Sequence, residues 1–409
     1  MKNKENIELI PKLRFLTLPI KNWDEKKLQD IFIYLSTNTY SRNLLNNKQG
    51  IYQNIHYGDI LIKYGCIIDA QRDEIPYINE DVKCTTNNII MDGDIVMADT
   101  AEDEIVGKTS EIFNIGDKKI LSGLHTFWLR PLISFAPKYL GYFFNSTQYH
   151  NQLLPLIQGA KVSSISKKAL NNTIIVYPST SEQQKIADCL SSLDELIEAT
   201  AQKVDALKEH KKGLMQRLFP AEGKNVPDLR FPEFQASEKW ERKIIQDICN
   251  ITTGNKNTQD KKENGIYPFF VRSPKVERID SWSFDGEAIL TAGDGVGVGK
   301  IFHYYVGKMG VHQRVYLLYD IQCNSKYLYY FFSEFFYERV KKMSAKNSVD
   351  SVRKDMISDM PLLLPSSQEQ QKIADCLSSL DELIEATSQK VEILKEHKKG
   401  LMQQLFPKI

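Results

Sequence analysis

The sequence predicts an α+β protein in which two mixed α/β domains are separated by two long α-helices. Three observations support this fold class: a 39-residue segment that occurs twice, heptad spacing of apolar residues in both copies, and short β-rich runs around them. We expect the helices to form an antiparallel coiled coil with pseudo-twofold symmetry. The length of 409 residues is sufficient for two or three domains that each bury a core.

The repeat defines the order of the parts. Residues 182–220 and 369–407 are separated by a constant offset of 187 and differ at four of 39 positions. A weaker echo lies near the start of each domain, as Pro11-Lys-Leu-Arg-Phe15 and Pro227-Asp-Leu-Arg-Phe231. Recent duplication by recombination explains the identity but not why it stops so sharply. We therefore expect a domain, a helix, a second domain and a second helix, at residues 1–181, 182–220, 221–368 and 369–409.

Apolar residues recur in both copies with alternating steps of four and three, which is a heptad seam. Such a seam must be covered, and the other copy in the same polypeptide is the favoured partner, with pairing between chains as the alternative. Pro220 and Pro407 end the two helices. The seam residues are Ile186, Leu190, Leu193, Ile197, Val204, Leu207, Leu214 and Leu218 in the first copy, and Ile373, Leu377, Leu380, Ile384, Val391, Leu394, Leu401 and Leu405 in the second.

Polar residues fill the gaps in this seam. Thr200 and Lys211, with Thr387 and Lys398, either fix the register of the helices or lie where the seam is wet. A helix of about 37 residues extends about 55 Å, at about 1.5 Å per residue. It would act as a ruler holding two modules at a fixed separation, and a bipartite DNA site is the natural target for such a reader.

Both domains have mixed patterns. Helices are expected over residues 138–145 and 326–340, where dense aromatic residues such as Tyr139 and Tyr327 are better explained by core packing than by base stacking. Strands are expected at residues 60–62, 95–97, 127–129, 174–177, 288–290, 302–305, 315–318 and 362–364.

Several classes of function are excluded by what the sequence lacks. No run of eighteen apolar residues is present, so no membrane span is expected. Six scattered cysteines and seven scattered histidines give neither a disulfide framework nor a metal site, and a cytoplasmic location is expected. The glycine-rich segment at residues 292–300 fits neither phosphate-loop nor dinucleotide patterns, and amino-methyltransferase motifs are missing. We expect no catalytic site, no metal and no cofactor in this chain.

Two variable domains, each followed by a long repeated helix, resemble the DNA specificity subunit of type I restriction–modification systems. The most specific element is a proline, a short spacer and the sequence Glu-Gln-Gln-Lys-Ile-Ala-Asp, which occurs at Pro178 with Glu182 and again at Pro365 with Glu369. The resemblance covers essentially the whole chain. One departure is that Ser344 stands where the first copy has Gly159.

The resemblance implies a non-catalytic subunit whose two target-recognition domains each read half of a split DNA site. It also implies two modification (methyltransferase) subunits and restriction (endonuclease and translocase) subunits as partners. S-adenosylmethionine, ATP and Mg would belong to those partners, whose activities are adenine-N6 methylation and ATP-dependent cleavage. A coiled-coil scaffold for two protein ligands and a self-contained methyltransferase are the alternatives.

Base edges in the major groove are read by Arg, Lys, Asn, Gln, Ser and Thr, which suggests two clusters in each domain. One cluster lies at a strand start, and the other lies in the loop before the last strand. Ordinary surface polarity explains any single member equally well. The strand-start candidates are His125 and Thr126 in the first domain and His312, Gln313 and Arg314 in the second. The loop candidates are Lys161, Ser163, Ser164, Ser166 and Lys167 in the first domain and Lys346, Asn347, Ser348 and Arg353 in the second. Arg272, Lys275 and Arg278, in the second domain only, are further candidates.

The charge balance opposes a simple DNA-binding surface. Lysine and arginine number 53 against 52 aspartate and glutamate, a net charge of +1. Because phosphate recognition requires an excess of cations, we expect this chain to read bases while its partners supply much of the phosphate attraction. The isolated chain should then bind DNA poorly.

Overall fold

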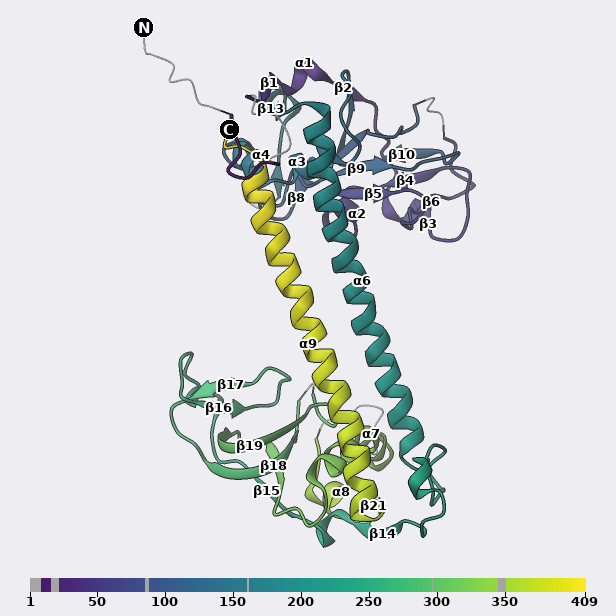
Figure 1. The fold of residues 1–409 in the computed structure, drawn as a ribbon, viewed down its shortest axis with the longest axis vertical. Coiled ribbons are helices and arrows are strands. Elements are labelled where there is room, and N and C mark those ends of the chain that lie inside the picture. Colours follow the sequence, from purple (N-terminus) through teal and green to yellow (C-terminus); the bar gives the residue numbers. More distant parts are fainter. Residues whose placement is uncertain (1–8, 16–21, 85–87, 160–161, 296, 345–350) are drawn as a thin grey trace. The chain divides into compact units, whose positions relative to one another are not determined.

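The computed structural model describes residues 9–15, 22–84, 88–159, 162–295, 297–344 and 351–409 (Figure 1). The chain divides into two compact units, one of residues 1–200 and 390–409 and the other of residues 201–389. The first unit therefore combines the first domain with the start of one long helix and the end of the other. The second unit combines the second domain with the remaining parts of both helices.

The long helices are α6 (Thr180–Leu218) and α9 (Ser367–Leu405). Both begin two residues before the expected start, directly after Pro178-Ser and Pro365-Ser, because the proline excludes a helix upstream. Both end one residue before a Phe-Pro pair, which stops the helix. No helix among the described residues is long and apolar enough to cross a membrane.

The first domain contains two mixed sheets. Their strand orders are β2-β11-β7-β9-β5 and β10-β4-β6-β3, with β5–β9 and β4–β10 paired in parallel. Trp128 of β11 pairs with Leu35 of β2 and Val96 of β7. The bounds are β1 Asp24–Lys27, α1 Leu28–Ile31, β2 Phe32–Leu35, β3 Leu45–Asn46, β4 Gln53–Ile55, α2 Tyr57–Ile62, β5 Ile67–Asp69, β6 Tyr77–Ile78, β7 Ile95–Ala98, β8 Thr100–Ala101, β9 Thr109–Phe113, β10 Ile120–Ser122, β11 Thr126–Pro131, α3 Tyr139–Phe144, α4 Thr147–Leu153, β12 Ser163–Ser164, α5 Lys167–Leu170 and β13 Ile174–Tyr177.

The second domain is built on one six-stranded sheet with the order β15-β20-β18-β19-β16-β17. The long antiparallel pair β18–β19 forms its centre, and helix α7 packs against both strands. The bounds are β14 Glu241–Ile244, β15 Asn250–Thr253, β16 Tyr267–Phe270, β17 Glu277–Ile279, β18 Phe284–Ala292, β19 Phe302–Val311, β20 Val315–Tyr319, α7 Ser325–Met343, α8 Lys354–Ser358 and β21 Pro361–Leu364.

Seven of the eight expected strand runs are strands, but the strand expected at residues 60–62 is wrong. These residues end helix α2, which His56 caps by accepting a hydrogen bond from the Gly58 backbone N–H at 3.2 Å. Ile60 is fully buried whereas Ile62 is exposed. The cap starts a helix that three consecutive apolar residues alone cannot reveal.

The dense aromatic residues are core residues, as expected. Helix α3 contributes four buried aromatic residues to the core of the first unit: Tyr139, Tyr142, Phe143 and Phe144. On α7 the rings of Tyr327 and its aromatic neighbours are buried or half-buried. None of these residues offers an open face on which a base can stack.

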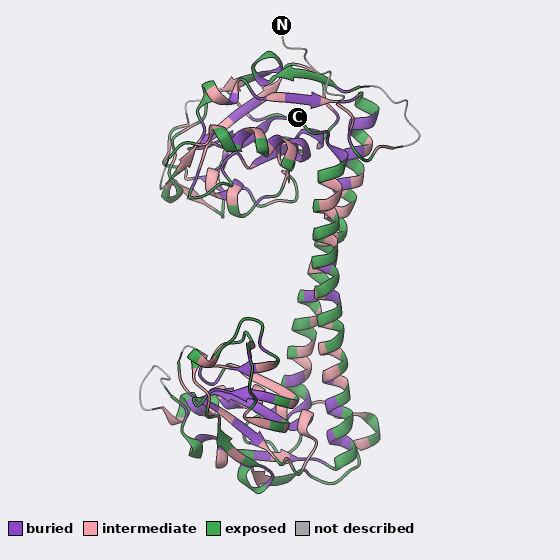
Figure 2. Cartoon of the chain, turned by 90° about the vertical axis from the view of Figure 1, so that its left-hand side faces the viewer, coloured by how far each residue is buried: buried purple, intermediate pink, exposed green. Residues whose placement is uncertain are grey.

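Each core also includes parts of both long helices. Ile186 and Leu190 at the start of α6 and Phe406 just beyond α9 belong to the core of the first unit. In the second unit, Ile373 at the start of α9 packs in the same core as Phe219 just beyond α6. Within each unit the helix segments therefore run in opposite directions, and buried residues gather where they meet the domain (Figure 2).

Every predicted seam residue is buried or half-buried, and the polar seam positions have specific partners. Lys211 forms an ion pair with Asp381 at 2.5 Å and lies over the ring of Tyr330, whose hydroxyl donates to the same carboxylate. In the first unit, Lys398, Asp194 and Tyr142 form the same arrangement. Thr200 and Thr387 are buried and donate to the carbonyls of Leu196 and Leu383 in their own helices.

A buried ion pair explains the echo near the start of each domain. Arg14 donates to Glu182 at 2.8 and 2.5 Å, and Arg230 donates to Glu369 at 2.7 Å through two nitrogens. The next residue of each helix, Gln183 or Gln370, donates to the carbonyl of the preceding proline. The Glu-Gln pair thus binds the start of each helix both to the arginine of the echo and to the proline just before the helix.

Candidate nucleic-acid interface

Three segments meet in the second domain: the end of β18, the turn before β20 and the segment before α8. The Gly293 N–H donates to the Arg314 carbonyl at 2.8 Å, and the Val352 N–H donates to the Gly293 carbonyl at 2.7 Å. Gly293 allows this approach, since a Cβ there would lie 2.9 Å from the Arg314 oxygen. Two sequence-predicted clusters, separated by tens of residues, are therefore adjacent.

The first domain repeats this arrangement. The Asp99 N–H donates to the His125 carbonyl at 3.1 Å, and the Ile165 N–H donates to the Asp99 carbonyl at 3.0 Å. Asp99 follows β7, His125 precedes β11, and Ile165 lies between β12 and α5. We call these three-segment surfaces the first and second tips.

Acidic residues organise the side chains of both tips. In the second tip, Asp294 accepts from Arg272 at 2.8 Å and faces the Nε of Arg314 at 3.7 Å. In the first tip, Asp99 lies 3.5 Å from the Nδ1 of His125 and accepts from the Thr100 hydroxyl at 2.8 Å. Neither carboxylate is among the residues predicted from the sequence, because an acidic residue has no sequence signal that marks it as part of a DNA-reading surface.

Two exposed candidates of the second tip lie on a tight turn. The Val315 N–H donates to the His312 carbonyl at 2.9 Å, which closes a turn with Gln313 and Arg314 at its apex. Arg314 is 65% exposed, and Gln313 donates to the Asn257 side chain at 2.6 Å. Arg353, also exposed, precedes α8 and lies 3.3 Å from Asp355.

His312 supports the turn from inside. It is only 4% exposed, and its Nδ1 accepts a hydrogen bond from the Arg314 backbone N–H at 3.0 Å. Burial is the main cause that lowers its pKa, with the guanidinium of Arg272 acting in the same direction. A neutral ring with Nδ1 unprotonated suits this contact. His312 is thus too buried to contact bases itself.

In the first tip, His125 is 48% exposed and adopts a left-handed backbone with φ of 54°. Its ring makes a T-shaped contact with the ring of Tyr57, and the two ring centroids lie 5.3 Å apart. Thr126 differs from the prediction, since it is 5% exposed and its hydroxyl donates to the Gly123 carbonyl at 2.6 Å. Because the hydroxyl hydrogen of Thr126 is already donated to Gly123, we do not include Thr126 in the interface.

The remaining candidates divide into three groups. Ser163 and Ser164 form the short strand β12 against β8, while Ser166 caps α5 and Lys167 lies 4.0 Å from the ring of Tyr34. Arg278 donates to the carbonyls of Gly265 and Ile266, which places it in the sheet rather than in the second tip, and exposed Lys275 lies on the loop before it. The candidates that lie outside the described residues are Lys161, Lys346, Asn347 and Ser348.

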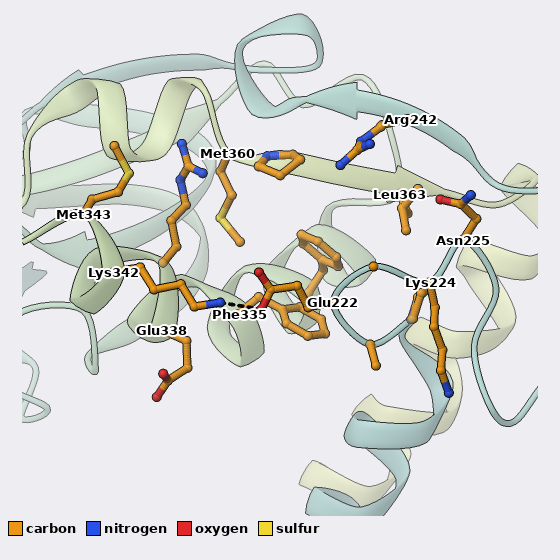
Figure 3. Close-up of a pocket in the computed structure, with 16 residues that line it drawn as sticks. Glu222, Lys224, Asn225, Arg242, Phe335, Glu338, Lys342, Met343, Met360 and Leu363 are labelled. Carbon is orange, nitrogen blue, oxygen red and sulfur yellow. Dashed lines mark hydrogen bonds and ion pairs between the residues drawn. The ribbon is translucent and has the colours of Figure 1, made fainter.

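An apolar pocket of the second unit is separate from the tip. It encloses about 300 Å³ between α7 and residues 220–225, and Figure 3 shows Lys342 paired with Glu222 across its mouth. Phe335 and Met360 supply apolar walls. No residue of the three tip segments lines it. Among the described residues, no group of His, Cys, Asp and Glu has the arrangement of a metal site.

Two domains of mixed sheets, each with an exposed polar tip and joined to paired long helices, define a two-module recognition protein. A model of the type I restriction modification DNA specificity domain matches residues 20–209 and again residues 237–396. The chain therefore belongs to the type I restriction–modification DNA specificity family.

Curated relatives are similar over different shares of their length. The chain is 29% identical over 171 residues to the type I restriction enzyme EcoDI specificity subunit of Escherichia coli, covering 40% of this chain and 37% of that protein. The MjaVIII specificity subunit of Methanocaldococcus jannaschii is 24% identical, with 61% of this chain and 65% of that protein covered. The putative MjaX subunit of the same organism is 24% identical, over 94% of this chain and 93% of that protein.

Solved structures share the fold. The type I restriction–modification S subunit from M. genitalium superposes with a TM-score of 0.61 at 16% identity, covering 98% of this chain and 99% of the other. A chain from a structure of complex assembly and conformational transition in a type I system gives 0.56 at 16% identity, with 95% and 99% covered.

Proposed function

We propose that this chain is the non-catalytic, sequence-specific DNA recognition subunit of a type I restriction–modification complex in the cytoplasm. Each domain reads one half of a bipartite site in the major groove through its tip. The observation that carries the proposal is that one backbone arrangement recurs in both domains with different exposed side chains, His125 in one and Arg314 in the other. Two different half-sites require the same backbone arrangement to present different base-contacting side chains.

The long helices set the spacing in this proposal. They pair as an antiparallel coiled coil with pseudo-twofold symmetry, and the Lys–Asp–Tyr groups around Lys211 and Lys398 fix their register. Because each group joins both helices to an aromatic residue of a domain, a shift of one heptad would break an ion pair in both units. This supports the register role over a wet seam.

The partners supply what this chain lacks. Two modification subunits dock on the near-identical helices, bring S-adenosylmethionine and clamp the duplex, while restriction subunits bring ATP and Mg. Without its helices, the first domain has a net charge of +1 and the second +2, counted from residues 1–181 (20 basic, 19 acidic) and 221–368 (21 basic, 19 acidic). The phosphate attraction that dominates affinity for DNA therefore comes mainly from the partners.

Methylome sequencing of cells with and without this chain tests the function. A bipartite methylated motif should disappear with the chain, and exchanging the first domain for that of a relative should change one half of the motif only. A continuous motif would contradict the two-reader proposal. An unchanged methylome would favour the alternative of a coiled-coil scaffold for two protein ligands.

Lengthening both helices by seven residues, after Thr200 and after Thr387, should move methylation to sites with a longer spacer. Seven residues preserve the heptad phase and add about 10 Å, which corresponds to about three base pairs of B-DNA. The measurement is the methylated motif of the complex. The same insertion in α6 alone serves as a control, because it displaces Lys211 from Asp381 and should abolish methylation. An unchanged spacer in the double insertion would refute the ruler.

If the modification subunits dock on the helices, substitutions at two equivalent exposed positions should each weaken the binding of one subunit. Leu196 and Leu383 occupy the same position in the two copies and are 45% and 42% exposed, which is unusual for leucine beside a seam. Leu196→Asp or Leu383→Asp should reduce the modification subunits bound per chain from two to one, measured by native mass spectrometry. The variant Glu198→Lys, on the exposed helix surface, tests for a general charge effect. Two bound subunits in every variant would place docking elsewhere.

A further inference from the structure

The second tip presents Arg314 on a frame that fixes its backbone at three points. Its N–H is bound by the buried His312 ring and its carbonyl by Gly293, and the turn closes through Val315. His312 is anchored in turn, since its N–H donates to the Phe270 carbonyl at 3.0 Å and its Nε2 lies 3.3 Å from the Thr258 hydroxyl. A long side chain on a fixed backbone loses less conformational entropy when it binds.

The side chain of Arg314 is oriented as well. Asp294 stands on the Nε side of its guanidinium and holds Arg272 with its other oxygen, so one carboxylate lies between two cations. The two outer nitrogens of Arg314 have no acceptor among the described residues. This leaves the donor fork, the part that matches paired acceptors, directed to solvent.

We propose that the second half-site contains a guanine read by Arg314, and that Asp294 and His312 are positioning residues for this contact. This inference rests on the proposed function and goes beyond it in naming a base. In the major groove only guanine offers two adjacent acceptors, O6 and N7, and a fork of two donors is the commonest group that recognises them. Phosphate oxygens are the competing target, and the experiment separates the two.

The first tip provides a contrast within the same chain. Its equivalent residue is His125, beside Asp99, with no arginine at this position. A single imidazole cannot offer the same fork of two parallel donors. The guanine requirement should therefore belong to the second half-site alone, which makes the first half-site an internal control.

The experiment uses the chain assembled with its modification subunits and a pool of DNA duplexes randomised over both half-sites. For the wild type, one position of the second half-site should require guanine. Arg314→Ala and Arg314→Lys should each reduce discrimination at that position by about 10- to 100-fold, because lysine lacks the fork. Preferences at all other positions and in the first half-site should stay unchanged, which a folding defect would not produce.

The positioning residues have their own signature. Asp294→Asn should relax the same position by about 2- to 5-fold, in the range of an exposed ion pair. His312→Ala should relax that position too, and His312→Asn should restore it, since the Asn oxygen can accept the Arg314 N–H. Asp99→Asn is the matched control and should alter the first half-site only. A merely structural role for Asp294 would weaken binding to all sequences equally.

Three results would overturn the inference while leaving the proposed function intact. One is a base other than guanine at the position that Arg314 controls. Another is unchanged base preference in both Arg314 variants. The third is a uniform loss of affinity together with a smaller salt dependence, which is the mark of a phosphate contact. A wild-type complex that selects no bipartite sequence at all would instead refute the proposed function.

Discussion

Replacing Phe406 with alanine should unfold the first unit at a temperature where the second unit is still folded. Phe406 is 2% exposed, and its ring lies 6.3, 6.0 and 5.8 Å from the rings of Trp23, Tyr139 and Phe143. Removing a buried phenylalanine costs about 3–5 kcal/mol of the free energy of unfolding, a large part of the stability of a domain. Hydrogen exchange read by mass spectrometry along the chain measures the effect separately for each unit.

Phe219→Ala is the matched control. Phe219 is fully buried among Tyr327, Phe331 and Phe335, so its loss should release protection in residues 201–389 and spare the first domain. The two variants have opposite expected effects. Phe406, at the end of α9, stabilises the first domain, and Phe219, at the end of α6, stabilises the second domain. Equal loss of protection in both units from either variant would contradict this division.

Glu182→Ala should destabilise the first unit by about 3–5 kcal/mol, because it leaves the guanidinium of Arg14 without its buried carboxylate. The two side chains are 13% and 3% exposed, so water replaces little of the lost interaction. Urea denaturation, followed by the fluorescence of a single tryptophan retained at Trp23, measures the change. Glu369→Ala should have a corresponding effect on the second unit, through Arg230.

A double variant shows whether the pair or the lone charge matters. Arg14→Met combined with Glu182→Gln removes both ionised groups and should lose much less stability than Glu182→Ala alone. If the double variant is as unstable as the single variant, the loss comes from packing around the helix start rather than from an unpaired charge.

The parts of the fold that repeat in the sequence were predictable from it, and the parts built by tertiary contacts were not. The heptad period marked α6 and α9 because packing two helices imposes that period. At residues 60–62 the apolar run was ambiguous, and a cap by His56 decided the structure. The position of Thr126 and His312 at a strand start indicates exposure to DNA but gives no measure of burial, and both residues are buried.

The candidate site shows the same limit. Polar residues before a strand and in a loop marked two clusters in each domain, and these clusters are adjacent in the described structure. Asp99 and Asp294 complete both tips, yet their role depends on backbone contacts between segments far apart in the chain. Only the fold brings Asp294 beside Arg272 and Arg314.

The way the chain is divided between the two units affects the order in which a ribosome can complete them. The second unit consists of consecutive residues, 201–389, and has all its parts once the first half of α9, up to residue 389, has emerged. The first unit needs residues 390–409, including Phe406, although its other part, residues 1–200, precedes the second unit in the chain. Domains made of consecutive residues usually fold in the order of synthesis. Here the first domain is completed last, because its core stays incomplete until residues 390–409 have emerged.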